Sequence, residues 1–106
     1  LIGEKFIDEE RFARAYARGK FRISKWGKIK IKTGLKQKRI SDYSIKAGLS
    51  EIEDEKYIET LKKLIDDKKK SIKSDESPIK KNFKILRFVQ SRGFETDLIM
   101  DILNNK

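Results

Sequence analysis

The residues of this chain whose chemistry stands out are basic. Between Glu10 and Asp42 the sequence holds twelve Lys and Arg residues and no acidic residue. They are Arg11, Arg14, Arg18, Lys20, Arg22, Lys25, Lys28, Lys30, Lys32, Lys36, Lys38 and Arg39. Like charges at this density repel one another, so folding alone does not explain the block. A surface that meets a polyanion, nucleic acid first among them, would neutralise it.

The net charge is concentrated in the first half of the chain. Residues 1–50 contain 14 Lys and Arg against 5 Asp and Glu, a balance of +9. Residues 51–106 contain 13 against 12, a balance of +1, which completes the net charge of +10. The first half is therefore predicted to face a polyanion, and the second half to be ordinary solvated helix.

The composition argues against most catalytic sites. The chain has no Cys and no His, which removes the usual zinc ligands, thiol nucleophiles and imidazole bases. Asp8, Glu9 and Glu10 form a group of carboxylates, but they stand where a helix is predicted to begin. There Asp8 would be an N-cap, and the two Glu residues would complement the helix dipole. We expect no enzyme activity, no catalytic or metal-binding residue and no cofactor.

Targeting signals are not apparent in the sequence. No apolar run is long enough to cross a bilayer, and no secretory signal pattern is present. The lack of Cys fits a reducing compartment. We therefore expect a cytoplasmic protein without a membrane partner.

One sequence pattern occurs twice, and it predicts the elements that carry the basic residues. Leu35–Leu49 aligns with Val89–Leu103 without a gap, and Ile7–Phe12 aligns with Ile52–Tyr57. The second copy has nine extra residues in between, at a predicted loop near 71–79 that contains the only Pro. Two copies of one unit, each covering the apolar face of the other, predict a repeat protein.

The first copy predicts three helices. The first follows Asp8 and frays near Ile23, the second runs from about Lys28 to Lys38, and the third is capped by Ser41 or Asp42. The residues expected to face the core are Phe12, Ala15, Tyr16, Gly19, Ile31, Leu35, Ile45 and Leu49.

The second of these helices has a conflicting local pattern. Lys28–Lys32 alternates polar and β-branched residues with period two, as a strand does, and Gly34 weakens a helix by about 1 kcal/mol. Helix is still favoured, because this segment aligns with a clearly helical one in the second copy.

The second copy predicts three more helices. Gly93 stands where a helix C-terminal glycine adopts positive φ, and Thr96 would cap the last helix. The expected core residues are Tyr57, Leu61, Leu64, Ile65, Phe83, Leu86, Val89, Ile99, Met100 and Leu103. We predict an all-α fold of tandem three-helix repeats, stacked into an elongated, curved helical array.

Three segments resemble signatures of the regulatory protein RecX family. Phe6–Tyr16 resembles its aromatic–x–Asp–[Asp/Glu]–x–Arg–Phe–Ala signature, Trp26–Ile40 resembles its Gly–x–x–Lys–Ile–x–x–x–Leu–x–x–Lys–Gly–Ile segment, and Leu86–Phe94 resembles its Leu–x–x–Arg–Gly–Phe ending. The ordered set covers essentially the whole chain. Two departures stand out: Arg39 replaces a usual glycine, and Gly34 lies inside a helix.

The resemblance implies a domain arrangement and a partner. Family members have three tandem three-helix repeats, so residues 7–50 would be the second, residues 51–106 the third, and residues 1–6 the tail of the first. Such proteins bind the RecA recombinase, chiefly as its filament on single-stranded DNA. They mainly inhibit its ATP hydrolysis, strand exchange and filament growth, in recombination, DNA repair and the SOS response. No small-molecule substrate is implied.

We expect a basic face to contact this filament, either through the recombinase or through DNA. The residues expected on it are Arg18, Arg22, Lys25, Lys28, Lys30, Lys32, Lys36, Lys38, Arg39, Arg87 and Arg92. Trp26 is interpreted as a turn or core residue more readily than as a base-stacking platform. Arg11 and Arg14 either join this face or pair with acids of a neighbouring helix. The alternative function is a general basic helical module that binds nucleic acid without a specific protein partner.

Overall fold

Six α-helices and their connections make up this computed structural model, which describes the backbone of residues 2–104 and the side chains of residues 8–104. The helices are α1 (Ile2–Arg22), α2 (Lys28–Gln37), α3 (Asp42–Leu49), α4 (Asp54–Ser71), α5 (Pro78–Ser91) and α6 (Thr96–Asn104). Residues 2–104 contain no strand, and none of their helices is long and apolar enough to cross a membrane. The predicted all-α class is confirmed.

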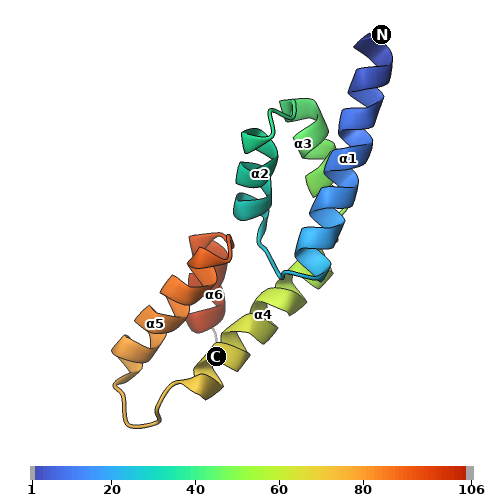
Figure 1. Cartoon of the computed structure of the whole chain (residues 1–106). Coiled ribbons are helices and arrows are strands. Elements are labelled where there is room, and N and C mark those ends of the chain that lie inside the picture. The colour runs from blue at the N-terminus through green and yellow to red at the C-terminus, as the bar shows by residue number, and fades with distance from the viewer. Residues whose placement is uncertain (1, 105–106) are drawn as a thin grey trace.

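The molecule is elongated rather than spherical. It measures 61 × 24 × 21 Å, and its radius of gyration is 16.2 Å, against about 13 Å for a compact domain of 100 residues. Helices α1–α3 form one end of the molecule, and α4–α6 form the other (Figure 1). The predicted elongated array of three-helix repeats is therefore confirmed. The expected tail, residues 1–6, has its side chains outside the described residues, and its backbone from residue 2 belongs to α1.

Helix α2 forms despite its strand-like sequence. Ile31 and Leu35 are fully buried, one turn apart on the same face. The glycine inside this helix has a packing role, because a Cβ at Gly34 would lie 2.3 Å from the hydroxyl oxygen of Tyr16. Gly34 thus lets the Tyr16 ring approach α2 closely.

The predicted start of α1 is wrong. The helix begins at Ile2, so Asp8, Glu9 and Glu10 lie within it and do not cap it. Glu9 instead accepts a hydrogen bond of 3.0 Å from the backbone N–H of Ser41, the N-cap of α3. These carboxylates therefore connect α1 to the start of α3.

The predicted inner face of α1 is also partly wrong. Ala13, Ala17 and Phe21 are the buried residues, whereas Phe12 is 44% exposed and Ala15 is exposed as well. The cause is the close packing of α1 on α3, where a Cβ on Gly48 would lie 2.7 Å from the Ala13 carbonyl oxygen. Only small side chains fit this contact, so the face with alanines turns inward.

The second repeat buries most of its predicted residues. Phe83 and Met100 are exceptions, with 56% and 38% of their surfaces exposed. The buried positions of α5 are Ile85 and Val89, and Phe83 lies about 200° around the helix from Ile85. Thr96 is the first residue of α6 rather than its cap, and its hydroxyl accepts a hydrogen bond from Gln90.

The C-terminal turns of α2 and α5 correspond to each other. Arg39 after α2 has φ 61° and Gly93 after α5 has φ 92°, both in the left-handed region. At α2 the N–H of Ile40 donates to the carbonyl of Leu35 at 3.1 Å, as in a Schellman motif. Because Arg39 is not a glycine, this conformation costs about 1–2 kcal/mol.

The N-terminus of α2 is capped by the second repeat. Its N-cap residue Gly27 offers no side chain, but the Gly27 N–H donates to the Arg92 carbonyl at 2.6 Å. The Ile29 N–H donates to the Gly93 carbonyl at 3.0 Å. These bonds join the C-terminal end of α5 to the start of α2, so the two helices follow one another along one side of the molecule (Figure 1).

The phenol of Tyr57 completes this junction between the repeats. Its oxygen accepts a hydrogen bond from the Lys28 N–H at 2.9 Å and its hydroxyl donates to Glu95 at 2.5 Å. The ring stacks on Phe94 with the centroids 4.9 Å apart. Burial, and secondarily the hydrogen bond to Glu95, raise the pKa of Tyr57 above its ordinary value.

Candidate polyanion-binding surfaces

The structure places the predicted basic residues in three separate regions rather than on one continuous face. One region is the exposed side of α2 and the turn after it. Another is the junction between the repeats, continued by α5. The third is the side of α1 that faces away from α2.

The exposed side of α2 and the turn after it carry four cations that we name the α2 ridge. They are Lys32, Lys36, Lys38 and Arg39. All four are exposed, and none forms an ion pair within the described part of the chain. Lys32 and Lys36 are four residues apart on one helix, so they share a face. The α2 ridge is therefore available to an external anion.

Lys28 belongs to the junction instead. Its ammonium lies 4.8 Å from the centroid of the Tyr57 ring and 3.7 Å from a carboxylate oxygen of Asp54. Its side chain is only 27% exposed. Lys28 therefore links the two repeats, and its charge is partly neutralised.

Lys30 is also engaged within the molecule. Its ammonium lies 4.8 Å from the centroid of the Trp26 ring and 3.4 Å from the Ser91 carbonyl, to which it donates. Lys20 lies 4.8 Å from the same indole. Trp26 is thus in contact with two ammonium groups in the turn before α2, and it contacts Tyr16 edge to face. This packing favours the turn interpretation of Trp26.

Arg87 and Arg92 lie at different places on the second repeat. Arg87 is exposed on α5, with its guanidinium 5.6 Å from the centroid of Phe83. Arg92 is half-buried at the C-cap of α5, with its guanidinium 5.2 Å from the centroid of Phe88. Arg87 therefore extends the accessible basic surface, whereas Arg92 stabilises the junction.

Arg18 and Arg22 lie away from the α2 ridge. At 100° per residue they are about 200° and 240° around α1 from Tyr16, whose ring faces α2. Arg18 Nη1 forms an ion pair of 3.0 Å with Glu51, between α3 and α4. Arg22 and Lys25 form no ion pair with a described residue.

Glu51 also resolves the alternatives for Arg14. The Arg14 guanidinium bonds to Glu51 and, at 3.1 Å, to Glu10 one turn earlier in α1. These bonds raise the pKa of Arg14, and the bonds from Arg14 and Arg18 lower the pKa of Glu51. Arg14 therefore pairs with acids. Arg11 is exposed and forms no ion pair among the described residues.

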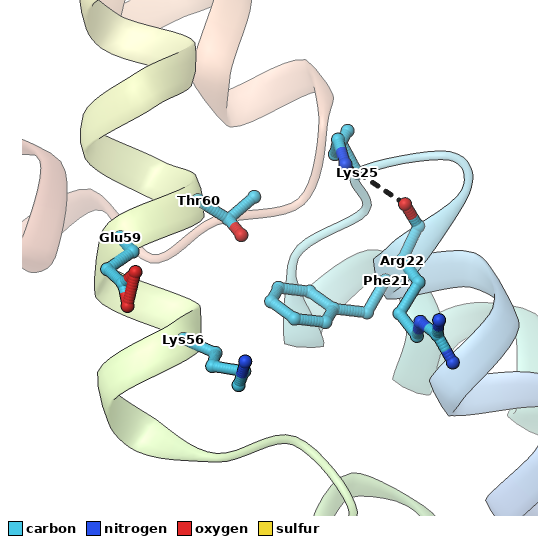
Figure 2. A pocket seen from close by; sticks show the side chains of 6 residues that line it. All are labelled: Phe21, Arg22, Lys25, Lys56, Glu59 and Thr60. Carbon is cyan, nitrogen blue, oxygen red and sulfur yellow. Dashed lines mark hydrogen bonds between the residues drawn. The ribbon is translucent and has the colours of Figure 1, made fainter.

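Sequence reasoning missed the contribution of α4 to the basic surface of α1. Lys56 and Thr60 of α4 line a hollow together with Phe21, Arg22 and Lys25 (Figure 2). The charge balance of residues 51–106 hides Lys56 among neighbouring acids. Only the fold brings it next to the basic block.

Tandem three-helix repeats of this kind define a helical-repeat protein. Comparison with protein families assigns the repeats more closely. Residues 8–49 match the model of the second three-helix domain of RecX, and residues 54–103 match that of the third. The chain belongs to the RecX family of regulatory proteins.

Individual relatives support this assignment. A regulatory protein RecX of Clostridium tetani is 36% identical over 105 residues, which cover 98% of this chain and 48% of the relative. Those of Clostridium acetobutylicum and Lactobacillus johnsonii are 35% and 32% identical, over 92% of this chain and 46% and 36% of the relatives. The chain thus spans half or less of the length of these relatives. No solved structure matches it.

Proposed function

We propose that this chain is a non-enzymatic regulator that binds a RecA-type recombinase, chiefly as its filament on single-stranded DNA. Binding would restrain ATP hydrolysis, strand exchange and filament growth, in recombination, repair and the SOS response. The proposed cellular location is the cytoplasm, where the recombinase and DNA meet. Residues 7–50 and 51–106 act as the second and third repeats of the family arrangement.

The observation that carries the proposal is the α2 ridge on a member of the RecX family. Its four cations form no ion pair with a described residue, and they lie on an elongated array of helices. An elongated basic surface complements a filament that displays acidic protein and phosphate along its length. Electrostatic attraction of this kind accelerates association and fixes the register of binding.

The first test is ATP turnover by recombinase filaments preformed on single-stranded DNA and titrated with this chain. The test variant is Lys32→Glu with Lys36→Glu, because both residues are exposed and neither forms an ion pair with a described residue. We expect its half-suppressing concentration to rise about tenfold, which corresponds to about 1.4 kcal/mol. Lys28 is unsuited to this test, since it contacts Asp54 and Tyr57.

A matched control changes the charge equally elsewhere. Lys62→Glu with Lys73→Glu reverses two exposed charges on the second repeat. Equal weakening by both pairs would mean that only net charge matters. No suppression by the unmodified chain at any ratio would contradict the proposal.

A general nucleic-acid-binding module is the second candidate, because the basic surfaces need no protein partner to bind phosphate. If about six phosphates of single-stranded DNA are contacted, log K should fall with log salt with a slope of about −4. A shallow slope together with tight filament binding favours recombinase recognition. A steep slope, with suppression only when the DNA is coated, favours the general module.

A further inference from the structure

The hollow between α1 and α4 lies apart from the α2 ridge. It is lined by Phe21, Arg22 and Lys25 from the end of α1 and its following turn, and by Lys56, Glu59 and Thr60 from α4. Figure 2 shows Lys56 reaching from α4 toward the end of α1, while the Phe21 ring points from α1 toward α4. The hollow therefore has an aromatic side chain between walls supplied by both repeats.

The charges around this hollow are not balanced. Arg22, Lys25 and Lys56 are exposed cations, and none has an ion pair within the described residues. Glu59 is the only acid among the lining residues, so the lining has a net charge of +2. Bringing three cations together from two repeats does not help the fold, because like charges repel. An external anion would remove this repulsion.

The neighbouring acids do not fill this role. A second hollow shares Phe21, Arg22 and Lys56 and continues to Glu51 and Glu53. Both carboxylate oxygens of Glu51 already accept hydrogen bonds, one from Arg14 and one from Arg18. Glu53 is exposed at the N-cap of α4 and forms no ion pair with a described residue. The two hollows adjoin at the residues that they share, two of which are the cations Arg22 and Lys56, and we name them together the groove.

The backbone conformation of Lys25 is a further feature of this groove. Lys25 has φ 57°, in the left-handed region that a residue with a side chain adopts at a cost. Its ammonium donates to the Arg22 carbonyl at 3.0 Å, which holds the side chain at the end of α1 (Figure 2). Glycine would make this turn without strain. A strained lysine is therefore present where the fold alone would favour glycine.

We propose that this groove binds the phosphate group of a phosphate ester, supplied either by a nucleic-acid strand or by a free nucleotide. A guanidinium, two ammonium groups and the Thr60 hydroxyl offer several donors to the oxygens of one phosphate. The hollow of about 530 Å³ is large enough for a nucleotide. The inference needs no recombinase partner, so it stands or falls separately from the proposed function.

The test measures binding of a labelled oligothymidylate of about 12 nucleotides, a length within the known site sizes of single-strand binders, over a range of salt concentrations. The groove variant is Arg22→Gln with Lys56→Gln, and the control is Lys62→Gln with Lys73→Gln, which removes two exposed charges elsewhere. Loss of the one phosphate contact made by the groove should reduce the magnitude of the salt slope by about 0.7 in the groove variant. The control should keep the slope of the unmodified chain.

Lys25→Gly keeps the test independent of misfolding. This variant relieves the backbone strain, so its thermal stability should rise while the magnitude of the salt slope falls by no more than about 0.7. ATP without metal is the second ligand, followed through the fluorescence of Trp26, the only Trp and a neighbour of Lys25 in sequence. The two ligands distinguish the sources of the phosphate.

A reduced slope for the oligothymidylate assigns the groove to a strand. An unchanged slope with ATP binding weakened about tenfold assigns it to a free nucleotide. Retention of both kinds of binding by the groove variant and by Lys25→Gly overturns the proposal. A loss that the control pair reproduces in full also overturns it.

Discussion

Gly27 and Gly93 pack backbone against backbone where the two repeats meet. A Cβ on Gly27 would lie 2.3 Å from the Gly93 carbonyl oxygen, and a Cβ on Gly93 would lie 2.3 Å from the Lys30 Cβ. The same contact brings the Gly27 N–H within 2.6 Å of the Arg92 carbonyl. The junction therefore depends on two positions without side chains.

Substitution at this contact should loosen the whole array. Gly27→Ala forces the repeats apart, because the atoms opposite belong to rigid backbone. We expect the free energy of unfolding in urea to fall by about 1–3 kcal/mol. Gly19→Ala is the matched control, since a Cβ there meets nothing within 4 Å. Gly19 is inside α1, so this control should gain about 0.5–1 kcal/mol. Destabilisation by both changes would argue against a specific junction contact.

Loss of the Tyr57 hydroxyl should destabilise the junction by a different route. Tyr57→Phe leaves the Lys28 N–H and the Glu95 carboxylate without this partner, at a cost of about 1–3 kcal/mol. Urea denaturation measures the change. Glu95→Gln retains an acceptor oxygen for the phenol, so it should cost less than Tyr57→Phe. The opposite order would assign the stabilisation to the charge of Glu95.

Tyr57 should also shape the stability of the protein in alkali. Its pKa is raised in the folded state, so the folded chain holds the proton more tightly than the unfolded chain. The stabilisation is complete below pH 10.0, the ordinary value, and is lost as pH rises through the folded pKa. The difference in the free energy of unfolding between the unmodified chain and Tyr57→Phe should therefore shrink above pH 10.0. A constant difference in urea midpoints would contradict this.

Glu51 should contribute to the loss of stability in acid. Its pKa is lowered by hydrogen bonds from Arg14 and then Arg18, so the folded state favours the carboxylate. This stabilisation is present above pH 4.5, the ordinary value, and is lost as pH falls through the folded pKa. Urea midpoints of Glu51→Gln should converge on those of the unmodified chain below that pH. Glu59→Gln is the control for the loss of one negative charge, since Glu59 is exposed and forms no ion pair with a described residue.

Arg39→Gly should separate stability from function on the α2 ridge. Glycine adopts the φ of 61° without strain, so the variant should be more stable by about 1 kcal/mol, or about 4–8 °C in Tm. If the α2 ridge binds the filament, the same variant should suppress ATP turnover less well. A thermal melt and the filament titration measure the two effects. Lower stability in the variant would mean that the Arg39 side chain supports the fold.

Much of the fold could be predicted because the sequence of each repeat supports the interpretation of the other. Leu35 and Val89 align and are both buried, as are Ile45 and Ile99. This pairing also identified α2 as a helix against its strand-like alternation. These aligned positions share an environment, so two weak periodicities became one strong signal, although Phe12 and Tyr57 align and only Tyr57 is buried.

The inner face of α1 could not be predicted in the same way. Whether Phe12 or Ala13 faces inward depends on how closely α1 approaches Gly48 of α3, and residue spacing within α1 does not encode that distance. The start of α1 was misjudged for a related reason. An Asp followed by two Glu residues suits the start of a helix and also its exposed interior.

The binding surfaces were predictable only in part. Exposure of Lys32 and Lys36 follows from their spacing relative to Ile31 and Leu35. The engagement of Lys28 with Tyr57, and the approach of Lys56 to Arg22, depend on contacts between the repeats. Such contacts leave no local pattern in the sequence.

The junction between the repeats has a consequence for divergence within the family. Its central hydrogen bonds, Gly27 N–H to Arg92 carbonyl and Ile29 N–H to Gly93 carbonyl, use main-chain atoms alone. Every residue except proline can supply an amide N–H, and every residue supplies a carbonyl. Surface charges can therefore be exchanged during evolution while the spacing from one repeat to the next stays constant. Main-chain bonds set the distance between the repeats, and the side chains on the surface are free to change.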